Sequence, residues 1–163
     1  MDLSEKEKLV VLRICLQTGI FTTAQIEQWA IKNLNISGVI RNDYILDLCS
    51  AERLGINEVS SILKQNETDT NKFNIKELLY GIAGYLFRNK TISLVKAGSL
   101  INLAAIEINE EITSNDFGYH IEDSIYLATQ GMYGTIEQVS IELLSLTNSF
   151  QPLAENFIND FLT

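Results

Sequence analysis

Hydrophobic residues recur along the chain at the spacing of amphipathic helices. Three segments show it most clearly: Ile26, Trp29, Ala30 and Leu34; Ile75, Leu78, Leu79, Ile82 and Leu86; and Ile136, Val139, Leu143 and Leu146. Intervals of three and four residues place these apolar side chains on one face of a helix. No segment shows a convincing two-residue alternation, although residues 91–95 are β-prone enough to leave a short strand open.

The periodicity predicts helices at residues 4–18, 22–34, 41–53, 57–66, 74–89, 93–110, 116–130, 135–148 and 151–161. Three pairs have the spacing of a capping box, in which the side chains of two residues accept each other's backbone N–H groups: Thr22 with Gln25, Asn74 with Glu77, and Thr135 with Gln138. These pairs are expected to mark helix starts.

Glycine and proline mark further helix boundaries. Gly19, Gly55 and Gly131 stand where helices are expected to end, a position that favours a left-handed backbone. Pro152 suits the first turn of a helix, where its missing N–H group has no partner to lose.

The expected helices pair into hairpins with a hydrophobic residue in the turn. These turn residues are Phe21, Leu54, Ile92 and Tyr133, at spacings of 33, 38 and 41 residues. Such spacings are typical of helical-hairpin repeats of the HEAT or tetratricopeptide size. We therefore expect an all-α fold of stacked antiparallel helical hairpins, either a short HEAT- or tetratricopeptide-like solenoid or a bundle, since any antiparallel bundle also contains hairpins.

The last predicted helix, residues 151–161, is expected to close this arrangement. Its apolar residues Phe157, Ile158 and Phe161 would then cover the last hairpin. The segment would act as a C-terminal closing helix.

Length and composition indicate a single packed domain. A chain of 163 residues, 46% hydrophobic and 20% charged, can bury a sizeable core, so one domain over residues 1–163 is expected. Residues 1–8 do not resemble a signal peptide, and no apolar run approaches the roughly 20 residues that cross a bilayer. We expect a cytoplasmic protein in which Cys15 and Cys49 are buried, reduced thiols.

Charge is distributed unevenly along the chain. Residues 97–163 contain ten acidic residues and no Lys or Arg, whereas residues 1–96 contain twelve basic and eleven acidic residues. An acidic half of this kind repels nucleic acid and anionic membranes, and it speeds the encounter with a basic partner. The alternative is that the acidity only keeps the protein dispersed.

The sequence contains little that could support catalysis. His120 is the single histidine, so HExxH and paired Glu-x-x-His motifs are absent, as is a G-x-S-x-G motif. Gly81 and Gly84 lie within an amphipathic segment, where they favour close helix packing over phosphate binding. We therefore expect no enzymatic activity, no metal and no cofactor.

The segment 116–130 carries the candidate partner-binding site. An apolar arc of Phe117, Ile121, Ile125 and Ala128 is expected to face the core. The opposite face carries two tyrosines and two acids: Tyr119, Glu122, Asp123 and Tyr126. Tyrosine is enriched at binding hot spots and acids attract partners at long range, so this face is expected to bind a protein partner. The predicted surface comprises Glu107, Glu110, Glu111, Asp116, Tyr119, Glu122, Asp123, Tyr126, Tyr133 and Glu137. Alternatively, Tyr119 and Tyr126 pack against an adjacent hairpin.

A family resemblance is carried by the segment from Gly19-Ile20-Phe21-Thr22 to Trp29-Ala30. It is also carried by the size, helical repeats, acidity and lack of catalytic motifs of the whole chain. The chain resembles the immunity proteins of bacterial polymorphic toxin systems, including those of contact-dependent growth inhibition. The resemblance implies a protein that occludes the active site of a cognate toxin, such as a basic nuclease, with acids in place of the phosphates that a nuclease grips.

Two other interpretations fit the same sequence. One is a helical-repeat adaptor or regulatory subunit that binds a basic protein or peptide through the same surface. The other is an enzyme that acts on small substrates with clustered carboxylates, although Glu107, Glu110 and Glu111 at helical spacing are more typical of a solvated face. In each case we expect a monomer or a weak dimer.

Overall fold

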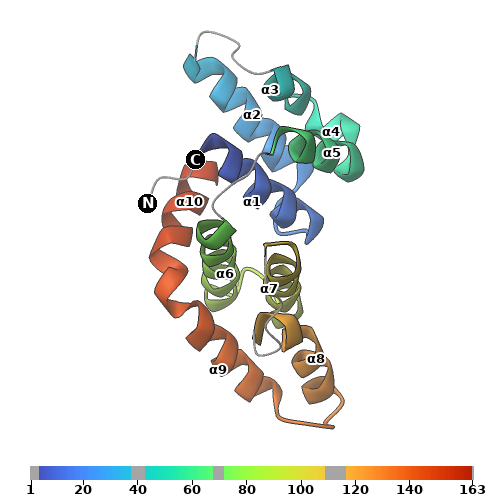
Figure 1. Cartoon of the computed structure of the whole chain (residues 1–163), viewed down its shortest axis with the longest axis vertical. Helices are drawn as coiled ribbons and strands as arrows, with labels where there is room; N and C mark the ends of the chain where they lie inside the picture. The colour runs from blue at the N-terminus through green and yellow to red at the C-terminus, as the bar shows by residue number, and fades with distance from the viewer. Residues whose placement is uncertain (1–3, 38–42, 68–71, 109–116, 163) are drawn as a thin grey trace. The chain divides into compact units, whose positions relative to one another are not determined.

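The computed structural model describes residues 4–37, 43–67, 72–108 and 117–162 (Figure 1). Its elements are α1 Glu5–Gln17, α2 Thr23–Ser37, α3 Asp43–Leu48, α4 Ala51–Leu54, α5 Ile56–Asn66, α6 Lys72–Arg88, α7 Leu94–Ile108, α8 Phe117–Thr129, α9 Ile136–Thr147, the 3-10 turn η1 Asn148–Phe150 and α10 Gln151–Leu162. The all-α prediction is confirmed over the described residues. Residues 91–95 form a turn and the start of α7, so the described chain contains no strand there.

Helix boundaries agree with the prediction except at a few points. The helix expected at 41–53 is divided into α3 and α4, because the N–H of Ser50 turns back to the carbonyl of Asp47 at 3.1 Å. Thr22 and Gln25 form their capping box, with the Thr22 N–H donating to Gln25 Oε1 at 2.9 Å. The box expected at Asn74 is wrong, since α6 already begins at Lys72.

Two further capping boxes mark helix starts. Thr135 and Gln138 form the predicted box at the start of α9. Ser4 and Glu7 form one at the start of α1 that the sequence analysis did not identify. Each box satisfies backbone N–H groups that the first turn of a helix leaves without an internal partner.

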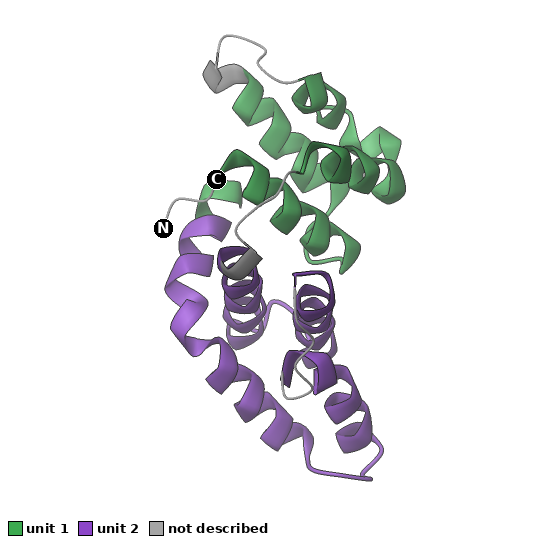
Figure 2. Cartoon of the chain, in the orientation of Figure 1, with its two compact units in different colours: residues 1–70, 159–163 green, residues 71–158 purple. Residues whose placement is uncertain are grey.

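The chain divides into two compact units (Figure 2). Unit 1 comprises residues 1–70 and 159–163, and unit 2 comprises residues 71–158. The division does not coincide with the charge boundary at Lys96, so unit 2 contains both basic and acidic residues.

Unit 1 is organised around α1. Every residue from Leu9 to Leu16 is buried, so this helix is enclosed all round rather than on one face. Within the unit, α1 packs against α5, α2 packs against α3 and α4, and α3 packs against α5. Burial of a whole helix surface explains why α1 shows only a weak amphipathic pattern.

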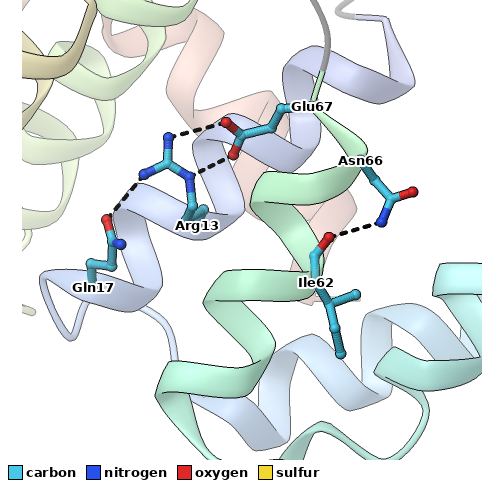
Figure 3. Close-up of polar contacts among 5 residues, drawn as sticks. All are labelled: Arg13, Gln17, Ile62, Asn66 and Glu67. Carbon is cyan, nitrogen blue, oxygen red and sulfur yellow. Dashed lines mark hydrogen bonds and ion pairs between the residues drawn. The ribbon is translucent and has the colours of Figure 1, made fainter.

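Two charged residues of α1 are buried, Glu7 of the capping box and Arg13. Arg13 Nε donates to Glu67 Oε1 at 2.6 Å, and Arg13 Nη2 donates to Glu67 Oε2 at 3.1 Å (Figure 3). Arg13 Nη1 also donates to Gln17 Oε1 at 3.2 Å. Glu67 is the residue that ends α5, so this two-bond ion pair ties α5 to α1.

The last turn of α10 belongs to unit 1, which corrects the expected role of the closing helix. The ring of Phe161 stacks on Phe21, with centroids 4.4 Å apart. Phe21 lies in the turn between α1 and α2, so Phe161 covers this first turn and not the last predicted hairpin. Ile158 is buried as expected, and Phe157 is only partly buried.

Unit 2 contains α6 to α9, η1 and most of α10. The helices α6, α7, α8 and α9 pack in a ring, in which α6 contacts α7 and α9, and α8 contacts the same two helices. This order of neighbours is typical of an antiparallel four-helix bundle.

Glycines allow the helices of unit 2 to approach closely. A Cβ atom at Gly81 would lie 2.9 Å from the carbonyl carbon of Phe150, and a Cβ at Gly84 would overlap Thr147. Gly98 contacts Ile125 in the same way. The expectation that Gly81 and Gly84 serve helix packing is confirmed.

Three hairpin turns share one backbone conformation. The left-handed residues are Gly19, Lys90 and Gly131, at φ of 68°, 57° and 65°. In each turn, the N–H of the residue that follows donates to the carbonyl oxygen five residues earlier. These bonds run from Ile20 to Cys15, from Thr91 to Leu86 and from Met132 to Leu127, at 2.8, 2.9 and 2.9 Å. This is the Schellman motif that commonly ends a helix.

The hydrophobic turn residues Phe21, Ile92 and Tyr133 each stand two positions after the left-handed residue. They therefore have the same position relative to the left-handed residue of their turns. Leu54 differs, because it comes directly before the positive-φ residue Gly55. Three of the four turns follow the same pattern.

Among these three left-handed residues, Lys90 is the one that carries a side chain. A left-handed backbone is less strained in glycine than in lysine. We expect Lys90→Gly to raise the free energy of unfolding by about 0.5–1 kcal/mol. The matched control Lys8→Gly, at an exposed position inside α1, should lower it by about 0.5–1 kcal/mol. Urea unfolding followed by circular dichroism measures both; a loss of stability in Lys90→Gly would contradict the strain argument.

Removing Glu67 takes away the carboxylate to which the buried Arg13 guanidinium donates two hydrogen bonds. Since Glu67 keeps some solvent contact, we expect Glu67→Ala to lower the free energy of unfolding by about 2–3 kcal/mol. The control Glu58→Ala, exposed on α5, should change it by less than about 0.5 kcal/mol. Equal effects of the two substitutions in urea unfolding would show that the pair adds no stability.

Candidate protein-binding surface

The acidic residues of the predicted surface lie partly outside the described chain. Glu110, Glu111 and Asp116 belong to segments that the structure does not describe. Glu107 is exposed near the end of α7. The continuity of the acidic region from α7 to α8 stays a prediction.

The two tyrosines of α8 lie in different environments. The apolar arc faces the core as predicted, with Ile121, Ile125 and Ala128 buried. Tyr126 is 62% exposed. In contrast, the hydroxyl of Tyr119 is buried and has no hydrogen-bond partner in the described structure. The packing alternative therefore applies to Tyr119, and solvent exposure applies to Tyr126.

Glu122 is exposed but already bonded within unit 2. Ser99 Oγ donates to Glu122 Oε1 at 2.5 Å, and Asn102 Nδ2 donates to Glu122 Oε2 at 2.7 Å. Both donors belong to α7, so the carboxylate ties α8 to α7. Its two oxygens are therefore engaged, whereas Asp123 is exposed beside it.

The turn between α8 and α9 exposes large side chains. Met132 is 71% exposed, Tyr133 is 79% exposed and Ile136, the first residue of α9, is 42% exposed. The N–H of Met132 bonds to the carbonyl of Leu127, which holds the turn against the end of α8 close to Tyr126. Ile136 shares the helical spacing of Val139 and Leu143, which are buried, but is itself exposed.

The turn between α1 and α2 has the same backbone conformation, but its aromatic residue is buried. Phe21 occupies the equivalent turn position and is 3% exposed, because Phe161 stacks on it. Tyr133 has the same backbone setting and stands in solvent. A large exposed apolar group with ordered backbone around it is typical of an interaction site.

Acidic residues flank these side chains. Asp123 lies one turn before Tyr126 on α8, and Glu137 lies in the first turn of α9, directly after Ile136. Both carboxylates are exposed. We call the following set the α8–α9 surface: Asp123, Tyr126, Met132, Tyr133, Ile136 and Glu137. It retains four predicted residues and adds Met132 and Ile136.

Comparisons with protein-family models, curated proteins and solved structures find no match. The function of the α8–α9 surface must therefore be argued from its own chemistry. No helix in the described ranges is long and apolar enough to cross a membrane. In those ranges, no three His, Cys, Asp or Glu side chains are arranged to hold a metal ion, and His120 is exposed on α8.

The two cysteines differ in accessibility. Cys15 is buried in α1 as expected, and burial raises the pKa of its thiol. Cys49 is only partly buried, in a shallow depression that Glu27 and Arg53 also line, so the expectation of full burial is wrong for it. Desolvation and, to a smaller extent, the negative charge of Glu27 raise the pKa of Cys49.

These environments predict different thiol reactivities, since the thiolate is the reactive form. We expect a thiol reagent to label Cys49 in the folded protein and Cys15 only after unfolding. Glu27→Gln keeps an oxygen acceptor for the Glu52 N–H, which now donates to Glu27 Oε2 at 2.9 Å, but removes the charge. The lower pKa of Cys49 in this variant should speed its labelling about two- to threefold near neutral pH. Unchanged labelling would contradict the role of the Glu27 charge.

Proposed function

We propose that this chain is a protein-binding inhibitor that uses the α8–α9 surface to occlude the cationic active site of a basic protein toxin. The observation that carries the proposal is the exposure of Tyr126, Met132 and Tyr133 near exposed carboxylates, in a region that contains no Lys or Arg. Tyrosine and methionine are enriched in protein interfaces, and acids attract a basic partner.

The surface suits two stages of binding. The net charge of residues 97–163 would steer a basic protein toward this region before contact. The exposed rings and the methionine side chain would then lose water against the partner and hold it. Association would therefore depend mainly on charge, and dissociation mainly on the apolar side chains.

The resemblance to immunity proteins supports a toxin as the partner. A nuclease binds phosphates through basic side chains, and exposed carboxylates can occupy the same positions. The stack of helical hairpins predicted from the sequence belongs to this proposal as well, since stacked hairpins offer an extended surface for a protein partner. If the partner proves to be a basic housekeeping protein instead, the adaptor interpretation applies.

The test is a binding titration against the C-terminal domain encoded by the gene immediately upstream. We expect binding that is tight at about 20 mM salt and weaker at about 300 mM salt, because salt screens exposed charges. Binding should also inhibit the activity of that domain. No binding at either salt concentration would refute the proposed partner.

Substitutions distinguish the contribution of charge to association from the contribution of apolar side chains to dissociation. Asp123→Lys with Glu137→Lys should slow association about tenfold, while Tyr133→Ala should speed dissociation at least about tenfold. Glu58→Lys, an exposed charge reversal on α5, is the matched control and should leave both rates nearly unchanged. If the control slows association as much as the double reversal, the attraction is not specific to the α8–α9 surface.

A further inference from the structure

Two exposed aromatic rings stand at the same end of the α8–α9 hairpin. Tyr126 lies in the last turn of α8, and the N–H of Tyr133 reaches the carbonyl of Leu127 at 3.4 Å. Leu127 follows Tyr126 directly, so the backbone places both tyrosines beside the end of α8. Exposed carboxylates lie nearby in the chain: Asp123 three residues before Tyr126 on α8, and Glu137 in the first turn of α9, four residues after Tyr133.

The charge of the surface limits what can cover these rings. In the first hairpin, the aromatic ring of Phe161 covers the equivalent Phe21. A second copy of this chain would bring a second set of the same carboxylates, Asp123 and Glu137, into a two-fold contact, and like charges close together oppose binding. A purely apolar partner would leave both carboxylates without a counter-charge.

Glu122 is held by hydrogen bonds within unit 2. Ser99 and Asn102 each donate to one of its oxygens, so we assign the direct charge pairing to Asp123 and Glu137. Each of these acids therefore has a tyrosine close to it in sequence, Asp123 with Tyr126 and Glu137 with Tyr133. A side chain that satisfies both members of such a pair must be cationic and must also pack flat on an aromatic ring.

Arginine meets both requirements. Its planar guanidinium stacks on aromatic rings while its N–H groups donate to a carboxylate, whereas the compact ammonium of lysine is more strongly hydrated. We propose that the α8–α9 surface recognises arginine in preference to lysine side chains of its partner. This inference rests on the proposed function, because it takes the partner to be a basic protein.

The test compares two peptides of equal length and charge, one with arginine and one with lysine alternating with glycine. The full chain is titrated with each peptide at about 20 mM salt, where exposed charges are weakly screened, and amide NMR shifts give the affinity. We expect the arginine peptide to bind about four- to twenty-fivefold more tightly, since stacking on each of the two tyrosines favours arginine about two- to fivefold. The largest shifts should fall on residues 126–137.

Tyrosine variants test whether the preference for arginine arises at the α8–α9 surface. The double variant Tyr126→Leu with Tyr133→Leu keeps apolar side chains and the full charge, and it should bind both peptides equally. Tyr85→Leu, a half-buried tyrosine on α6, is the matched control and should retain the preference for arginine. Circular dichroism checks that each variant is folded.

The remaining outcomes overturn the inference in different ways. Equal binding of the two peptides by the natural chain would refute arginine recognition while leaving a charge-based inhibitor intact. Binding of neither peptide at about 20 mM salt would count against both proposals, because attraction is strongest there. A dimer in sedimentation that Tyr133→Leu abolishes would assign the surface to a second copy of this chain instead.

Discussion

Close backbone approach at glycines is the constraint on which unit 2 depends. Gly81 and Gly84 of α6 contact Phe150 and Thr147, and Gly98 of α7 contacts Ile125 of α8. Gly118 of α8 extends the same principle, because a Cβ there would overlap the Tyr80 hydroxyl and lie 3.1 Å from Ala105 Cβ. Interiors are close-packed, so added side-chain atoms at these points would separate the helices. The positions of α8 and α9, and with them the α8–α9 surface, follow from these contacts.

One turn conformation serves two purposes in this chain. The Schellman motif places a hydrophobic residue at the same position after α1, α6 and α8. After α1 this residue is Phe21, which contributes to folding because Phe161 covers it. After α8 it is Tyr133, which remains in solvent. The difference lies in what else the fold brings to the turn, and tyrosine suits the exposed position because its ring is apolar while its hydroxyl stays hydrated.

The candidate site shows how far a helical wheel can be trusted. The wheel placed the buried arc of α8 correctly, and it grouped Tyr119, Glu122 and Tyr126 on the opposite face. It could not show that Tyr119 packs inward at its hydroxyl or that α7 supplies donors to Glu122, because both depend on a neighbouring helix. Spacing also does not distinguish the exposed Ile136 from the buried Val139 and Leu143, since the first turn of a helix can extend beyond the core that its later residues contact.

The helical class, most helix boundaries, the turn residues and the one-sided charge could be predicted from the sequence. These properties depend on local spacing, on capping side chains within three residues of each other, and on composition. The folded structure was needed to learn which turn residues are covered, which carboxylates are hydrogen-bonded and which turn Phe161 covers. Those outcomes depend on contacts between residues far apart in the chain, and a single helix carries no information about the surface that packs against it.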